Sequence, residues 1–135
     1  MQRSDLNILA EAYSMLSEIS LNNSSNNVSN IKVSPKGNFN CSNQNINSLE
    51  GSPKTIEGSF YCQQNSLDDL VGGPMMVGEH YDCSGNDLKR LTGLPKYIGG
   101  NLIISKQIES RFPESAIHNI CKIGGNIFYV SEAMY

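Results

Sequence analysis

Four cysteines are the residues of this sequence best suited to chemistry, because thiolates bind metal ions and exchange disulfides. They are Cys41, Cys62, Cys83 and Cys121, and the first three lie 21 residues apart. A metal site needs ligands that converge on one point, and a disulfide needs Cβ vectors that face each other. Thiols repeated at a fixed step point in parallel from neighbouring strands instead. We therefore expect buried thiols that pack as small apolar residues, with metal or redox work as the alternative, and we expect no metal and no cofactor.

His80 and Asp82 form the second chemical candidate. Residues two apart on a strand share a face, so a His beside a carboxylate could act as a general base. No nucleophile column accompanies them, and the pairs Gly72-Gly73 and Gly99-Gly100 lack the strand–turn–helix context of a dinucleotide site. We expect a protein that is not an enzyme and interpret His80 as an exposed binding residue. A hydrolase that uses His80 and Asp82 is the alternative.

A 21-residue repeat must position all of these side chains. Its consensus is Gly-x-Phe-x-Cys-x-x-Asn-x-Leu-x-x-Leu-x-Gly-x-Pro-x-x-Ile-Gly. The Phe-x-Cys alternation predicts a very short strand with one buried face, and the Gly and Pro predict a turn. Because one coil cannot bury its apolar residues alone, we expect coils to stack with parallel strands about 4.8 Å apart. The first column of the repeat contains Phe39, Phe60, Tyr81 and Leu102.

Side-chain amides form another column of the repeat. A side-chain amide that turns inward can bond to the backbone of its own coil and of the neighbouring coil. We expect this structural role for the whole column, with a catalytic amide as the alternative. The column contains Gln44, Asn65, Asn86 and Gln107.

The repeat resembles a leucine-rich repeat. Its Phe-x-Cys-x-x-Asn-x-Leu segment matches part of the motif Leu-x-x-Leu-x-Leu-x-x-Asn/Cys-x-Leu, whose period is about 20–29 residues. Its Leu-x-Gly-x-Pro turn is similar to that of short-repeat proteins from tailed bacteriophages and bacteria, and more distantly to secreted bacterial effectors. The resemblance covers residues 21–130. It implies an α+β solenoid with a leucine-rich-repeat-like parallel sheet, encoded by a phage, that binds and inhibits or redirects a host protein such as a defence factor.

The chain is predicted to be one domain, in which the repeats span residues 21–112. We expect full coils at 37–57, 58–78 and 79–99, a partial coil at 100–112 and a degenerate first coil at 21–36, whose stretch 22–30 could instead be a linker. Within residues 1–20, the spacing of Leu6, Leu9, Tyr13 and Leu16 predicts an amphipathic helix over 4–20. That helix either caps the first coil or docks a partner.

The segment 113–135 is predicted to be an irregular C-terminal cap. Pro113 can begin a helical turn over 113–122, with Ile117, Ile120 and Cys121 facing the core. The stretch 123–127 repeats the pattern of 98–102 with one conservative change. We therefore expect a final strand at 126–130 that joins the same sheet.

A partner would bind the outward side of the strands. If Phe39 and Cys41 point inward, the alternate positions form a regular outer face, which is how solenoids present binding surfaces. Tyr61, His80 and Ile103 are the expected anchors, because aromatic and apolar side chains supply most of an interface's energy. The alternative is that this face is solvated or covered by the terminal helix. The predicted binding residues are Asn38, Asn40, Ser59, Tyr61, Gln63, His80, Asp82, Asn101 and Ile103, with Gln64 and Ser84 just past the strands.

Composition narrows the class of partner. The net charge is −3 and no run of Lys or Arg is present, so we expect no nucleic-acid partner. No apolar stretch approaches about 18 residues and no signal-peptide pattern opens the chain, so we expect no membrane association and a cytoplasmic protein, in the host cell if phage-encoded. A protein partner is the main expectation. The alternative is an assembly protein that self-associates, for example as a homodimer, through the N-terminal helix or the solenoid ends.

Overall fold

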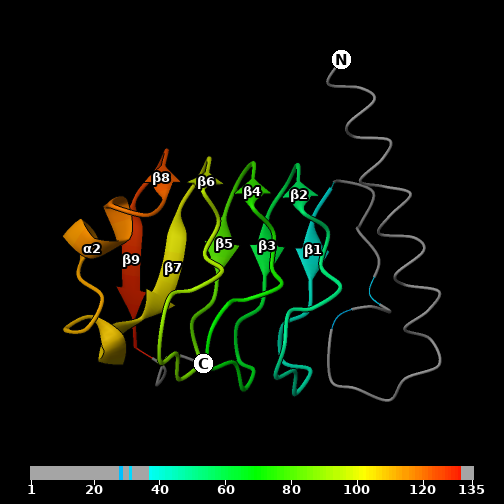
Figure 1. The fold of residues 1–135 in the computed structure, drawn as a ribbon, viewed down its shortest axis with the longest axis horizontal. Helices are drawn as coiled ribbons and strands as arrows, with labels where there is room; N and C mark the ends of the chain where they lie inside the picture. Colours follow the sequence, from blue (N-terminus) through cyan, green and yellow to red (C-terminus); the bar gives the residue numbers. More distant parts are fainter. Residues whose placement is uncertain (1–27, 29–30, 32–36, 132–135) are drawn as a thin grey trace.

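Short parallel strands, two in each coil, build the protein. The computed structural model describes residues 37–131 together with Val28 and Ile31. Its coils stack side by side along the longest axis of the molecule, and each coil places one strand on either side of a common core (Figure 1). This part of the chain is a parallel β-solenoid.

Within the described residues, the larger sheet has five strands and follows the predicted columns. Its strands are β1 (Phe39–Asn40), β3 (Phe60–Tyr61), β5 (Tyr81–Asp82), β7 (Leu102–Ser105) and β9 (Ile127–Val130), in that spatial order. The register pairs Phe39 with Phe60, Phe60 with Tyr81 and Tyr81 with Leu102, which confirms the 21-residue stacking. The predicted final strand is also confirmed, since β9 pairs with β7.

A second sheet of four strands lies on the return side of each coil. It contains β2 (Thr55–Ile56), β4 (Met76–Val77), β6 (Tyr97–Ile98) and β8 (Lys122–Ile123). The repeat consensus has an Ile at the inward position of this side, occupied by Ile56, Val77 and Ile98, but a second sheet was not predicted. Backbone pairing does not depend on side-chain type, so the paired positions Thr55, Met76, Tyr97 and Lys122 share no residue type that could reveal it.

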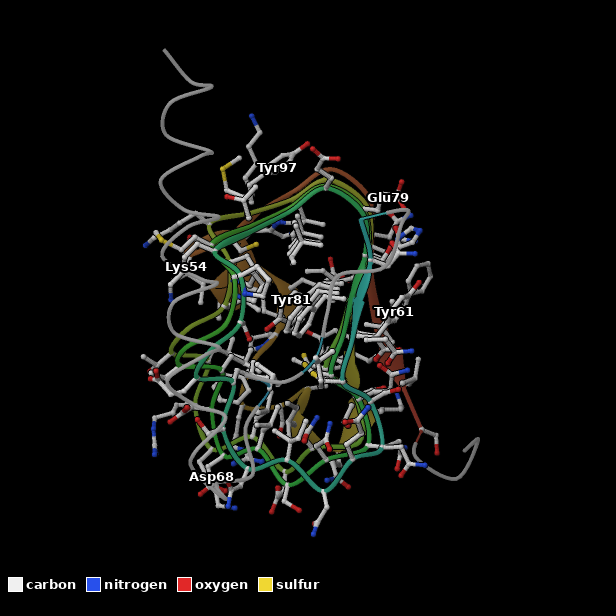
Figure 2. The ribbon with its side chains drawn as sticks, turned by 90° about the vertical axis from the view of Figure 1, so that its right-hand side faces the viewer. Lys54, Tyr61, Asp68, Glu79, Tyr81 and Tyr97 are labelled. Carbon is white, nitrogen blue, oxygen red and sulfur yellow. The ribbon has the colours of Figure 1, made fainter. Side chains whose placement is uncertain are left out.

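The core consists of side chains stacked layer upon layer between the two sheets. The Phe39 and Phe60 rings stack with centroids 5.5 Å apart, and the Tyr81 ring continues the stack 5.2 Å from Phe60. Cys41, Cys62 and Cys83 form the neighbouring column and are fully buried, as predicted. Figure 2 looks along the stack and shows Tyr81 inside the coils.

Glycines form the turn that leads to the return side in the three regular coils. Gly51, Gly72 and Gly93 have φ angles of 95°, 91° and 96°, a region that favours glycine. A Cβ at Gly93 would lie 2.1 Å from the carbonyl oxygen of Leu70 in the preceding coil. The Gly column of the repeat therefore reflects both backbone conformation and close approach of the coils.

The amide column is inward at two of its four positions. Asn86 Nδ2 donates to the carbonyl oxygens of Cys62 (3.0 Å), Cys83 (3.1 Å) and Ser84 (3.3 Å), and its Oδ1 accepts from the backbone N–H of Leu67 (3.0 Å). Asn65 repeats this arrangement one coil earlier, with Oδ1 accepting from the backbone N–H groups of residues 44 and 46.

The prediction is wrong for the other two members of the amide column. Gln44 and Gln107 are exposed. A glutamine carries one more methylene than an asparagine, and Gln107 lies within the 3₁₀ helix η1 (Lys106–Ile108) rather than in a regular coil. The amide ladder therefore spans the central coils.

The C-terminal cap replaces the regular turn of the last coil. Asn101 and Asn126 are 25 residues apart, whereas equivalent residues of the regular coils are 21 apart. The extra length includes the short helix α2 (Glu114–His118), which follows Pro113 as predicted. Ile117 and Cys121 are buried, but the expectation for Ile120 is wrong, because α2 has already ended and that side chain is exposed.

The N-terminal predictions lie largely outside the described residues. The helix over 4–20 and all of the coil 21–36 except Val28 and Ile31 belong to the part of the chain that is not described. Val28 is fully buried and Ile31 packs against the core, which continues the core beyond β1.

Candidate functional site

The outer surface of the five-stranded sheet carries the predicted binding residues. We call this surface the front face. It consists of two columns, one just before the strands and one on them. Figure 2 shows Tyr61 pointing away from the coils on this side, opposite in direction to Tyr81. The first column is Asn38, Ser59, His80, Asn101 and Asn126, and the second is Asn40, Tyr61, Asp82, Ile103 and Phe128.

The first column is a hydrogen-bond ladder that joins the coils. Asn38 Oδ1 accepts from the backbone N–H of Ser59 at 2.7 Å, and Ser59 Oγ accepts from that of His80 at 3.0 Å. His80 Nδ1 accepts from the backbone N–H of Asn101 at 3.0 Å, and Asn101 Oδ1 accepts from that of Asn126 at 2.9 Å. Each side chain thus satisfies the backbone N–H at the equivalent position of the next coil.

This ladder gives four of the predicted binding residues a structural role. Ser59 is only 1% exposed, so its expected exposure is wrong, because its hydroxyl lies between two coils. Asn38, His80 and Asn101 are half-buried. All four have in common an acceptor atom close to the backbone. Partner binding by these residues remains a prediction.

The geometry of His80 does not favour the general-base alternative. Its Nδ1 is occupied by the Asn101 N–H, which assigns the proton of a neutral ring to Nε2. Asp82 is engaged elsewhere, because its Oδ1 accepts from both the backbone N–H (3.0 Å) and Oγ (2.7 Å) of Ser84. No hydrogen bond or ion pair between His80 and Asp82 is present among the described residues.

Asp82 belongs to a local turn that recurs in the repeat. Asn40 Oδ1 accepts from the backbone N–H and Oγ of Ser42 in the same way, at 3.0 and 2.6 Å. Burial raises the pKa of Asp82, and the two hydrogen bonds from Ser84 oppose that rise. The second column therefore presents a partly desolvated carboxylate near the centre of the front face.

Apolar side chains form the other part of the second column. Tyr61 and Ile103 are half-buried, and Phe128 is 46% exposed. The register pairs Ile103 with Phe128, so the two lie on neighbouring strands. Phe128 was not among the predicted binding residues, although alternation along the predicted strand 126–130 places it on the outer face.

Gln63 lies at the end of the front face, just past β3. It is half-buried, and its Oε1 atom is shielded from solvent without a hydrogen-bond partner among the described residues. Gln64 is also half-buried and has a positive φ of 60°, while Ser84 is fully buried. Of the predicted extension past the strands, Gln63 and Gln64 are thus as accessible as the centre of the face, and Ser84 is not accessible.

The buried thiols are held in their protonated form. Burial raises the pKa of Cys41 to about 12 and that of Cys121 to about 11, and it raises the pKa values of Cys62 and Cys83 as well. Thiols are poor nucleophiles and poor metal ligands until they ionise. Among the described residues, no group of three His, Cys, Asp or Glu side chains is placed to hold a metal ion.

The described residues form a parallel β-solenoid whose front face mixes polar and apolar side chains. Across the part of the chain that is described, no helix combines the length and the apolar character needed to cross a bilayer. Comparison with known proteins gives no match, whether with family models, curated proteins or solved structures.

Proposed function

We propose that this protein is a non-catalytic interaction module whose front face binds another protein. The observation that carries the proposal is the second column, where Tyr61, Ile103 and Phe128 lie on the outer side of the sheet together with the carboxylate of Asp82. Exposed aromatic and apolar groups among polar ones are the usual composition of interface anchors.

The use of polar groups within the fold also supports binding over catalysis. The imidazole of His80 accepts a backbone N–H, and the oxygen of Asp82 closes a turn. The thiols are buried and protonated. Because these reactive groups stabilise the solenoid, the side chains that remain free for function are the aromatic and apolar ones of the front face, which can contact a partner but cannot react with a substrate.

The partner is expected to complement both the apolar and the polar side chains of the second column. An apolar patch would cover Ile103 and Phe128, which are adjacent in register. Hydrogen-bond donors would meet Asn40 and Asp82. We propose that the partner is a host protein that a phage-encoded chain inhibits or redirects, as the resemblance of the repeat to short-repeat proteins of tailed bacteriophages implies.

The test begins with affinity capture of a partner from host-cell lysate. The affinity of the purified partner for this protein is then measured by titration calorimetry. The double variant Tyr61→Ala/Phe128→Ala should raise the Kd at least about 30-fold, or about 2 kcal/mol. The matched control is Val71→Ala/Ile120→Ala, which removes exposed apolar side chains outside the front face.

Two results would contradict the proposal. One is equal weakening of binding by the two double variants. The other is sedimentation of the pure chain as large particles whose size does not respond to either variant, which would favour the alternative of an assembly protein.

A further inference from the structure

The outer surface of the four-stranded sheet is a second face with a different composition. We call it the back face. Figure 2 shows Lys54 and Tyr97 pointing outward on the side of the coils away from Tyr61. The back face has one column on the strands and one just before them: the first is Thr55, Met76, Tyr97 and Lys122, and the second is Lys54, Met75 and Lys96.

The lysines of the back face differ from every other described cation. Lys89, Arg90, Lys106 and Arg111 each lie within 4 Å of a carboxylate oxygen. Among the described residues, Lys54, Lys96 and Lys122 make no salt bridge, and all three are exposed. No acidic residue occupies these two columns, and one exposed acidic residue, Glu57, lies just past β2. A positive surface therefore exists on a chain whose net charge is −3.

Apolar side chains lie between these lysines. Met75 and Met76 are 50% and 49% exposed and occupy the coil between that of Lys54 and that of Lys96. The register places Met76 next to Tyr97 and Tyr97 next to Lys122, each about one strand spacing of 4.8 Å apart. Exposed methionines adapt their shape to a bound surface, and unpaired ammonium groups attract carboxylates.

We propose that the back face binds an acidic peptide segment of a partner protein, with apolar residues between its carboxylates. Lys54 and Lys96 are two coils apart, a separation of about 10 Å that matches about three residues of extended peptide. Carboxylates spaced about two to four residues apart would therefore reach the lysines while the apolar side chains between them cover Met75 and Met76.

A nucleic acid fits this surface less well than a peptide does. Its binding depends on neutralising many phosphates, whereas the back face offers three cations on an acidic chain. The exposed pair Met75 and Met76 fills the centre of the face with apolar surface that a phosphate backbone would not cover. The back face and the front face lie on opposite sheets, so this inference does not depend on the proposed function of the front face.

Selection from a random library of 12-residue peptides on the immobilised full-length chain tests the proposal. The selected sequences should be enriched in Asp and Glu together with Leu, Ile or Phe. A synthetic peptide from the selection should bind with a Kd that rises at least tenfold in Lys96→Glu/Lys122→Glu and in Met75→Ser/Met76→Ser. Higher salt should weaken that binding.

The matched charge control is Lys89→Glu/Lys106→Glu, which changes the net charge equally but alters cations outside the back face. Its Kd should stay within about twofold of the original, as should that of Tyr61→Ala/Phe128→Ala. Circular dichroism and a urea midpoint for each variant establish that it folds. If Lys96→Glu/Lys122→Glu does not fold, Lys96→Gln/Lys122→Gln takes its place, and the same tenfold rise in Kd is expected.

Three outcomes would overturn the proposal. The first is a selection without acidic enrichment, and the second is equal loss of binding in the two charge-reversed variants. The third is competition by polyaspartate or a DNA duplex as strong as that by the selected peptide, since neither competitor carries the apolar side chains that the methionines require.

Discussion

The buried amide of Asn86 is the point at which the solenoid should be most sensitive to a small change. Asn86 is 1% exposed, and its side chain makes four hydrogen bonds to the backbone of two coils. Asn86→Ala removes all four. The buried N–H of Leu67 then loses its acceptor, and the carbonyl oxygens of Cys62, Cys83 and Ser84 lose a donor.

The expected cost follows from these contacts. A buried N–H without an acceptor costs about 1–3 kcal/mol, and the lost donations to carbonyl oxygens add about 1 kcal/mol. Asn86→Ala should therefore lower the free energy of unfolding by about 2–4 kcal/mol. With a urea m value of about 1.5 kcal/mol per molar, the midpoint should fall by about 2 M. Asn86→Asp should be comparably damaging, because a carboxylate accepts from Leu67 but cannot donate to the carbonyl oxygens.

Urea unfolding followed by circular dichroism measures this effect directly. Gln44→Ala is the control, because Gln44 occupies the same column of the repeat and is exposed, so its cost should stay within about 0.5 kcal/mol. Equal midpoints for Asn86→Ala and Gln44→Ala would refute the conclusion that the inward amides hold the coils together.

Four further predictions concern the core and the front face. The Tyr81 hydroxyl is buried without a hydrogen bond of good geometry, so Tyr81→Phe should raise the free energy of unfolding by about 1 kcal/mol, and a loss of that size would contradict this. His80→Asn keeps an acceptor for the Asn101 N–H and should be nearly neutral, whereas His80→Leu should cost about 1–2 kcal/mol in the same urea assay. Because the pKa of Asp82 is higher in the folded state than in the unfolded state, Asp82 should lower the free energy of unfolding as pH rises from about 4 to above the raised pKa. Asp82→Asn keeps the acceptor oxygen and should lose less between about pH 3 and pH 7, and an unchanged pH slope would count against the raised pKa. The four buried thiols should react with iodoacetamide at pH 8 only after denaturation, as read by mass spectrometry, and rapid labelling of the native chain would show that the column opens.

Much of the solenoid could be predicted because its core repeats. Each inward side chain contacts the equivalent residue of the next coil, so Phe39, Phe60 and Tyr81 must resemble one another in size and polarity. The same constraint made the Cys column and the inward asparagines visible. The last strand was predicted as well, although a helix lengthens its coil, because the pattern before β9 matches the pattern before β7.

The candidate site was predicted less completely because its side chains do not repeat in type. Ser59 and His80 looked like exposed polar residues, yet each accepts a backbone N–H from the next coil. Asn, Ser and His can all accept in this position, so the shared role does not require a shared residue. Phe128 was missed as a member of the front face, although the predicted strand placed it there.

The sequence by itself determined which residues form the inward layers and that a regular coil is 21 residues long, because close packing restricts each core position to similar side chains. The tertiary structure decided how polar residues divide between holding coils together and facing solvent, and it created a second sheet with a lysine-rich outer face. Hydrogen bonds join backbone groups that residue identity does not encode, and the face on which Lys54, Lys96 and Lys122 lie without a salt bridge among the described residues forms only when the coils are stacked.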